Sequence, residues 1–192
     1  ILYDPSKLIE HWEVAASNLI LVFSTGVIYA STWRYILNSL WIYIEITLTN
    51  VDPSVMRIIL HQFERLGVHT IIDQENNRIT IPDNQSMEIK KDLGNAIPRI
   101  EDAPWPGFPA DLTSIMLVTA TQSNGTCLIH EKMFESRLFF TDNLLGMGAQ
   151  IILCDPHRAV IVGPTKFFGA RISSPDIRAG MALLIAAMSA EG

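Results

Sequence analysis

Acidic side chains stand at several positions where the sequence predicts the start of a helix. Asp111 and Asp176 each follow a proline-containing stretch and precede a run of small and apolar residues, while Glu131 and Glu135 lie near the start of another predicted helix. The ordinary role of such an acid is to cap the helix and complement its dipole, which contributes about 0.3–1 kcal/mol. A carboxylate placed there can also act as a general base.

Two arginines occupy similar positions. A cation near a helix start opposes the dipole, so Arg137 and Arg178 indicate an acidic partner or an anionic ligand, with an ordinary surface arginine as the alternative. Because repeated units bring equivalent helix starts to one end of a domain, we expect these arginines to line one face with Asp111 and Asp176. A carboxylate base beside positive groups suits chemistry on a hydroxyl near a phosphate.

Signatures of other chemistries are missing. The sequence contains no phosphate-binding loop, no dinucleotide-binding glycine motif, no His-Glu-x-x-His and no Gly-x-Ser-x-Gly. Cys127 and His130 have the spacing of metal ligands, but no second ligand pair accompanies them, so a buried strand thiol is the better interpretation of Cys127.

Composition narrows the class of protein. With 48% hydrophobic and 18% charged residues in 192, the chain is not disordered, and its net charge of −6 disfavours a non-specific polyanion binder. Nine arginines against five lysines leave a small anionic ligand open. Two cysteines make no disulfide framework, and no basic-then-apolar leader opens the chain, so we expect a cytoplasmic protein.

One apolar stretch is long enough to raise the question of a membrane. Residues 14–33 carry no charge, and a spanning helix needs about 20 mostly apolar residues. Ser17, Asn18, Ser24 and Thr25 weaken that interpretation and favour a buried helix and strand, with a membrane hairpin as the alternative.

An internal repeat is the strongest structural signal. Three segments share an acid, a helix of small and apolar residues and a closing glycine: 13–26, 111–125 and 176–192. Within the second, Ile115, Met116 and Ala120 have helical spacing, and Asn124-Gly125 predicts a left-handed cap at the end of the helix.

A second pattern alternates with these helices and completes the repeat. The predicted strands are 46–48, 68–72, 78–81, 126–129, 149–154 and 159–162, and the predicted helices are 53–66 and about 133–147. Gly67 and Gly148 close the two helices at matching places. Each unit therefore has the order strand, helix, strand, strand, helix, which predicts an α/β fold.

The segments between the units differ in character. Residues 98–109 are too rich in proline for a helix or a central strand. They lead directly to Asp111 at the start of its predicted helix, as Ser173-Ser174-Pro175 leads to Asp176. The aromatic stretch 27–44 has no counterpart in the later repeat and is an unexplained insertion.

Three ordered motifs resemble the UDP-N-acetylglucosamine enolpyruvyl transferases. They are Pro104-Trp105-Pro106-Gly107-Phe108-Pro109-Ala110-Asp111, Glu131-Lys132-Met133-Phe134-Glu135-Ser136-Arg137 and Asp176-Ile177-Arg178-Ala179. The resemblance is close over 103–192, weaker but in register over 45–82, and fails across 27–44.

The resemblance implies an inside-out, barrel-like α/β domain built from the repeated unit, with 1–192 as most of one of two such domains. It implies the transfer of enolpyruvyl from phosphoenolpyruvate to the sugar 3-hydroxyl of UDP-N-acetylglucosamine, with release of phosphate, in bacterial peptidoglycan synthesis. The implied partners are these two substrates and a second domain or complementary chain. No metal or cofactor is implied.

The resemblance also implies roles for single residues. Asp111 matches the aspartate that contacts the sugar hydroxyl and is the proposed base, and Met133 falls where the family contacts the nucleotide sugar. Arg137 matches an arginine that faces the phosphoenolpyruvate side of the site. Asp176 and Arg178 match the pair that shapes the cleft and grips phosphoenolpyruvate.

Several family features have no match in this sequence. An N-terminal Lys-Asn pair, a mobile loop with a reactive cysteine or aspartate and a final arginine are missing, so we expect the isolated chain to be inactive. Two alternatives stay open: a non-catalytic relative that binds sugar nucleotides or assembles with a partner, and an enzyme like 5-enolpyruvylshikimate-3-phosphate synthase.

Overall fold

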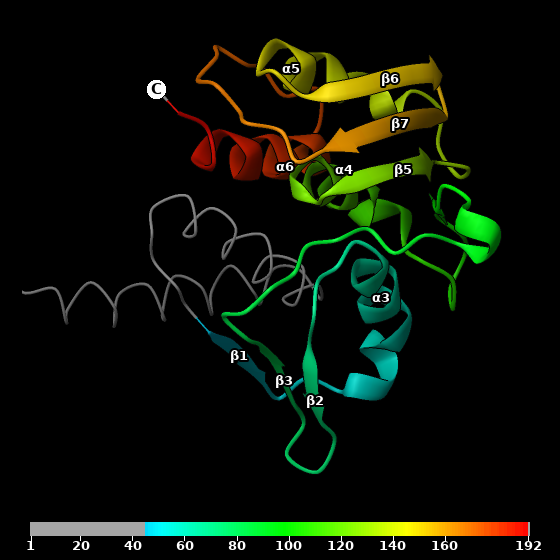
Figure 1. Cartoon of the computed structure of the whole chain (residues 1–192), viewed down its shortest axis with the longest axis vertical. Helices are drawn as coiled ribbons and strands as arrows, with labels where there is room; N and C mark the ends of the chain where they lie inside the picture. Colours follow the sequence, from blue (N-terminus) through cyan, green and yellow to red (C-terminus); the bar gives the residue numbers. More distant parts are fainter. Residues whose placement is uncertain (1–44, 192) are drawn as a thin grey trace, which may run out of the picture.

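A computed structural model describes residues 45–191 of the chain (Figure 1). The predicted helix 13–26, the aromatic stretch 27–44 and Gly192 lie outside the described residues. The elements are β1 (Ile46–Thr49), α3 (Pro53–Arg65), β2 (Ile71–Asp73), β3 (Arg78–Ile81), η1 (Leu93–Asn95), β4 (Arg99–Glu101), η2 (Ala110–Leu112), α4 (Thr113–Gln122), β5 (Gly125–His130), η3 (Arg137–Phe140), α5 (Thr141–Gly146), β6 (Gln150–Asp155), β7 (Arg158–Gly163) and α6 (Ile177–Met188).

The first unit is an antiparallel sheet in the order β1-β3-β2, packed against α3 in the lower part of Figure 1. Helix α3 begins at Pro53 because the Asp52 carboxylate accepts the Ser54 N–H at 2.9 Å and proline suits the first helical position. It ends before Gly67, whose φ of +87° is the left-handed conformation predicted for a helix cap.

The second unit repeats the first. Strands β5, β7 and β6 form an antiparallel sheet in that order, which matches β1, β3 and β2, and Gly148 with φ +99° matches Gly67. The predicted unit of strand, helix, strand, strand, helix is therefore confirmed. Strand β4 adds to the edge of the second sheet, parallel to β5, so the segment 98–109 contains neither a helix nor a central strand, as predicted. Strand β4 has three residues and lies at the edge of the sheet. It ends before Pro104, Pro106 and Pro109, so these prolines, which lack an N–H group, do not have to donate a hydrogen bond to the sheet.

Helix α4 is the centre of this part of the molecule. All of its residues from Thr113 to Thr121 are buried, so it has no solvent face. It packs against α6 on one side and β7 on another, and Figure 1 shows both helices beside the second sheet. A helix enclosed by sheet and helix is the inside-out α/β arrangement that the resemblance implied. Both sheets of the described region are open and neither closes into a barrel.

Two boundaries differ from the sequence prediction. Helix α4 ends at Gln122, with Ser123 as its C-cap, and Gly125 is the first residue of β5, because the Asn124 N–H donates to the Met87 carbonyl at 2.7 Å and draws the chain into extended pairing. The predicted helix 133–147 is only η3 and α5, because residues 131–136 form a loop in which Ser136 has φ +64°. In the region that the structure describes, no helix is long and apolar enough to cross a membrane.

We expect Gly163→Ala to destabilise the fold. A Cβ at Gly163 would lie 2.3 Å from the Ser123 carbonyl oxygen and 2.7 Å from that of Thr121, and backbone cannot move aside as a flexible side chain can. Overpacking of this kind costs about 1–3 kcal/mol. The matched control is Gly146→Ala, where a Cβ meets nothing within 4 Å and helix propensity favours alanine. Urea unfolding measures both, and equal midpoints would contradict the close approach.

Candidate functional site

Three charged side chains from three elements meet at one point. The Asp111 Oδ1 atom lies 3.2 Å from Arg137 Nη1 and 2.5 Å from Arg178 Nε. Asp111 is in η2 before α4, Arg137 begins η3, and Arg178 is in the first turn of α6. The expected gathering of helix starts is therefore present for these three residues.

Asp176 serves α6 as its N-cap. Its Oδ1 atom accepts the N–H groups of Arg178 and Ala179 at 2.8 and 2.9 Å. This is the ordinary structural role for an acid at a helix start, and it fixes the first turn from which Arg178 reaches Asp111. Asp176 thus lies beside the charged group and positions one of its members, while its contact with substrate remains a prediction.

The loop 131–136 lies between β5 and η3 and carries Met133. Met133 and Phe134 are 43% and 44% exposed, which leaves both side chains available for contact. The Phe134 ring lies 3.8 Å beneath the Arg137 guanidinium, and this cation–π contact holds the arginine over the loop. Glu135 is exposed in the same loop.

Two buried acids behind this loop were not recognised as a pair in the sequence. Asp102 is 1% exposed and accepts the main-chain N–H groups of Lys132 at 2.5 Å and Met133 at 3.1 Å. Glu131 is fully buried and neither of its carboxyl oxygens has a hydrogen-bond partner. The expectation that Glu131 complements a helix start was wrong, because it directly follows β5 and the next helix begins only at Arg137.

A period of two along the strands could have found this pair. In β5, Cys127 and Ile129 point into the core, and Glu131 is the next inward position. In β4, Ile100 points inward and Asp102 is the next such position. Strands β4 and β5 pair in parallel with Glu101 opposite His130, so the two acids follow at the same end of the sheet.

Burial raises the pKa of the Glu131 carboxyl to about 8, and the neighbouring Asp102 carboxylate adds to this effect. The Arg137 cation and the Thr113 hydroxyl act in the opposite direction without cancelling it. Glu131 is therefore uncharged at neutral pH. Two charged carboxylates side by side in the core would repel, and a neutral Glu131 removes that repulsion.

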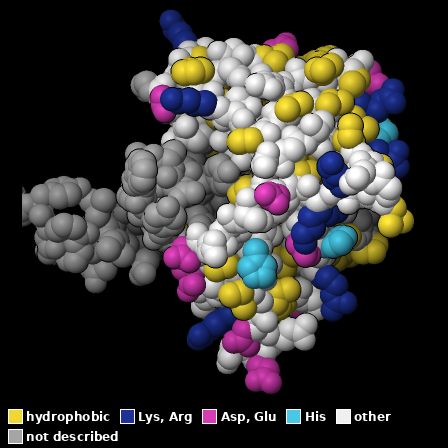
Figure 2. Space-filling view, viewed as in Figure 1, with side chains coloured by type: hydrophobic (Ala, Val, Ile, Leu, Met, Phe, Trp, Pro, Cys, Tyr) yellow, Lys and Arg dark blue, Asp and Glu magenta, His cyan; other side chains and the backbone are white. Residues whose placement is uncertain are grey.

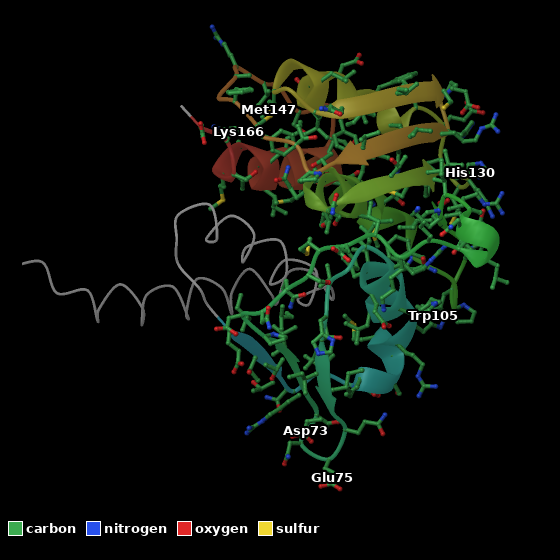
Figure 3. All side chains as sticks on the ribbon, in the orientation of Figure 1. Asp73, Glu75, Trp105, His130, Met147 and Lys166 are labelled. Atoms are coloured by element: carbon green, nitrogen blue, oxygen red, sulfur yellow. The ribbon has the colours of Figure 1, made fainter. Side chains whose placement is uncertain are left out.

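Basic side chains flank the end of the sheet. Glu101 contacts Arg99 Nε at 2.9 Å and Lys132 Nζ at 2.7 Å, with His130 beside it at 3.9 Å. Figure 2 shows Lys, Arg and His side chains on the edge where β5 ends, and Figure 3 places His130 and Trp105 along that side of the molecule. Met147 and Lys166 lie at the other end of the second unit (Figure 3).

The exposed ion pairs of the charged group contribute little to folding. The side chains of Asp111 and Arg178 are 58% and 42% exposed, and such pairs contribute at most about 1 kcal/mol. An anionic ligand can therefore replace Asp111 as partner of the two arginines at small cost. The freed carboxylate can then accept a proton from a hydroxyl.

Neither cysteine takes part in this arrangement. Cys127 is buried in β5, and burial raises the pKa of its thiol to about 12, which confirms a buried strand thiol. Cys154 is exposed in β6. Among residues 45–191, no group of three or more His, Cys, Asp or Glu side chains could hold a metal ion.

Comparison with known proteins identifies relatives. The family model for EPSP synthase (3-phosphoshikimate 1-carboxyvinyltransferase) matches residues 29–192. A UDP-N-acetylglucosamine 1-carboxyvinyltransferase of Treponema denticola is 57% identical over 148 residues, which are 77% of this chain and 34% of that protein. The protein of the same name from Bacteroides thetaiotaomicron is 56% identical over 151 residues, again 77% and 34%. The chain spans about a third of the length of these relatives.

Solved structures agree on the fold. The enolpyruvyl transferase NikO from Streptomyces tendae matches with a TM-score of 0.62 and 21% identity, covering 85% of this chain and 36% of that one. An EPSP synthase from Acinetobacter baumannii matches with a TM-score of 0.55 and 15% identity, covering 85% and 37%. At these identities the structural likeness shows the fold alone.

The buried Glu131 makes stability depend on pH. Its pKa is about 8 in the folded chain against 4.5 for an unperturbed carboxyl, so the folded state binds the extra proton between these values. The contribution of Glu131 to stability is therefore full below about pH 4.5 and falls as pH rises toward 8, by about 1.4 kcal/mol per pH unit. Unfolding free energies across this range should show that fall in the wild type.

The matched pair Glu131→Gln and Glu135→Gln isolates the effect. Glutamine at position 131 resembles the protonated acid, so that variant should lack the decline, whereas the exposed Glu135→Gln should follow the wild type. Parallel pH curves for all three proteins would show that Glu131 is ionised in the core.

Proposed function

The chain belongs to the EPSP synthase family of enolpyruvyl transferases, and from that premise we propose that it forms part of a UDP-N-acetylglucosamine 1-carboxyvinyltransferase. The observation that carries the proposal is Asp111 held between Arg137 and Arg178, a carboxylate base with two cations that an anionic substrate can claim. Relatives that are 57% and 56% identical carry this name, which favours it over the EPSP synthase alternative, where a solved structure shares 15%.

The proposed reaction uses the charged group in two ways. Phosphoenolpyruvate, which carries a carboxylate and a phosphate, displaces Asp111 as the ion-pair partner of Arg137 and Arg178. The freed Asp111 carboxylate accepts the proton of the sugar 3-hydroxyl, whose oxygen forms a bond to C2 of phosphoenolpyruvate while C3 takes a proton from a general acid that residues 45–191 do not supply. In the second step C3 returns a proton to the conjugate base of that acid, the bond from C2 to the phosphate oxygen breaks, and phosphate leaves with the bond electrons.

The remaining residues have binding roles in this proposal. Met133, exposed in the loop after β5, contacts the nucleotide part of the sugar nucleotide. Asp176 holds the first turn of α6 in place and, with Arg178, shapes the side of the cleft that binds phosphoenolpyruvate. The whole protein then acts in the cytoplasm on a peptidoglycan precursor, with residues 1–192 as one incomplete domain.

We expect this chain to bind UDP-N-acetylglucosamine in a calorimetric titration, and Asp111→Ala to weaken that binding about tenfold, equivalent to ~1.4 kcal/mol for the lost hydroxyl contact. The same variant should bind phosphoenolpyruvate at least as well as the wild type, because Asp111 no longer competes for the arginines. Arg178→Ala should weaken phosphoenolpyruvate instead.

The control is Glu75→Ala, an exposed acid at the tip of the β2–β3 hairpin, far from β5 in Figure 3. A wild-type chain that binds neither substrate would refute the proposal, and equal binding by Asp111→Ala would remove Asp111 from the site. A phosphate-release assay with both substrates should stay at background, because the chain spans about a third of its relatives. A complete protein that binds both substrates without releasing phosphate would favour the non-catalytic alternative.

A further inference from the structure

The loop 131–136 is attached to β4 through the Asp102 side chain. Both carboxylate oxygens of Asp102 are used: Oδ1 accepts the Lys132 N–H at 2.5 Å and Oδ2 accepts the Met133 N–H at 3.1 Å. The adjacent Glu101 also holds the Lys132 side chain, with Oε1 at 2.7 Å from Nζ. Lys132 and Met133 therefore depend on two consecutive acids, Glu101 and Asp102, at one strand end.

The charge of Asp102 matters because the side chain is buried. Hydrogen bonds from N–H groups to a carboxylate are stronger than those to a neutral oxygen, and an asparagine offers one acceptor where the aspartate offers two. Glu131 lies beside Asp102 with neither carboxyl oxygen in a hydrogen bond. A second negative charge there would oppose the first.

Resting on the function proposed above, we propose that Asp102 is a positioning residue for the nucleotide-sugar side of the site. Its carboxylate fixes the main chain of Lys132 and Met133 before substrate arrives, and a protonated Glu131 beside it allows that charge in the core. Binding then does not have to order this part of the loop, which saves the conformational entropy of fixing it.

Four groups on the elements packed around Glu131 face it and bear on the interpretation of any titration observed there. They are Asp102 after β4, Thr113 in α4, Arg137 in η3 and the His157 ring, whose Nδ1 lies 2.9 Å from the Glu131 carbonyl oxygen. Glu131→Gln removes the carboxyl titration and leaves His157 in place. A titration that disappears in this variant therefore belongs to Glu131.

The first test needs no ligand. In the full chain, the amide protons of Lys132 and Met133 should exchange more slowly than those of the exposed Phe134 and Glu135, corrected for intrinsic rates. Their amide signals should titrate with a midpoint of about 8 in the wild type and lose this titration in Glu131→Gln. Unprotected Lys132 and Met133 amides in the wild type, or a titration unchanged in Glu131→Gln, would overturn the proposal even if Asp102 variants do not fold.

The second test uses Asp102→Asn with Asp83→Asn as control, an exposed acid in the loop after β3 that undergoes the same change of charge. Asp102→Asn should speed exchange at Lys132 and Met133 about tenfold or more and weaken UDP-N-acetylglucosamine about tenfold. Phosphoenolpyruvate binding should change less, because the carboxylates of Asp111 and Asp176 hold Arg178 independently of this loop. Asp83→Asn should match the wild type.

The two proposals fail in different ways. If the wild type binds no nucleotide sugar, the proposed function fails and so does the substrate role of Asp102, while slow amide exchange would still show that it fixes the loop. If the wild type binds and Asp102→Asn binds equally well, the proposed function stands and the positioning role is refuted.

Discussion

The absence of a solvent face on α4 constrains the rest of the described structure. A helix buried from Thr113 to Thr121 must be surrounded, and the second sheet and α6 supply the surrounding surfaces. Two of its polar side chains are satisfied within the helix, since the Thr119 and Thr121 hydroxyls donate to carbonyl oxygens of the preceding turn at 3.0 and 2.6 Å. Burying such a helix therefore leaves few unpaired polar groups. Only its two ends approach the surface.

Each end of α4 then has a definite consequence. At the carboxyl end the backbone of β7 passes so close that only a glycine fits, at Gly163. At the amino end Asp111 emerges where η3 and α6 also begin, and the packing of α4 against α6 brings Arg178 to it. Because exposed ion pairs are weak, the fold gains little from these charges.

The sequence predicted what local chemistry determines. Gly67 and Gly148 ended their helices as predicted, since a left-handed residue favours glycine, and the two hairpins fell where apolar strands flank turn residues. Long-range pairing was not predictable in the same way. Strand β4 exists because β5 offers it an edge. The helix predicted from Met133 is a loop in which Ser136 has φ +64°, and Asp102, remote in sequence, holds the N–H groups of Lys132 and Met133 there.

Asp111, Arg137 and Arg178 could be predicted as a group from their residue types and their positions near helix starts. The buried acids Asp102 and Glu131 could be predicted only by continuing the in-and-out alternation of each strand beyond its last residue. The alternation that buries Ile100 and Ile129 continues to Asp102 and Glu131, so the sheet itself places two carboxyl groups together in the core. Two such groups cannot both be charged, and the one without hydrogen-bond donors takes the proton. Asp102 accepts the main-chain N–H groups of Lys132 and Met133, and these two hydrogen bonds order the loop that carries Met133. The geometry of an exposed loop thus depends on a buried acid at the end of a neighbouring strand.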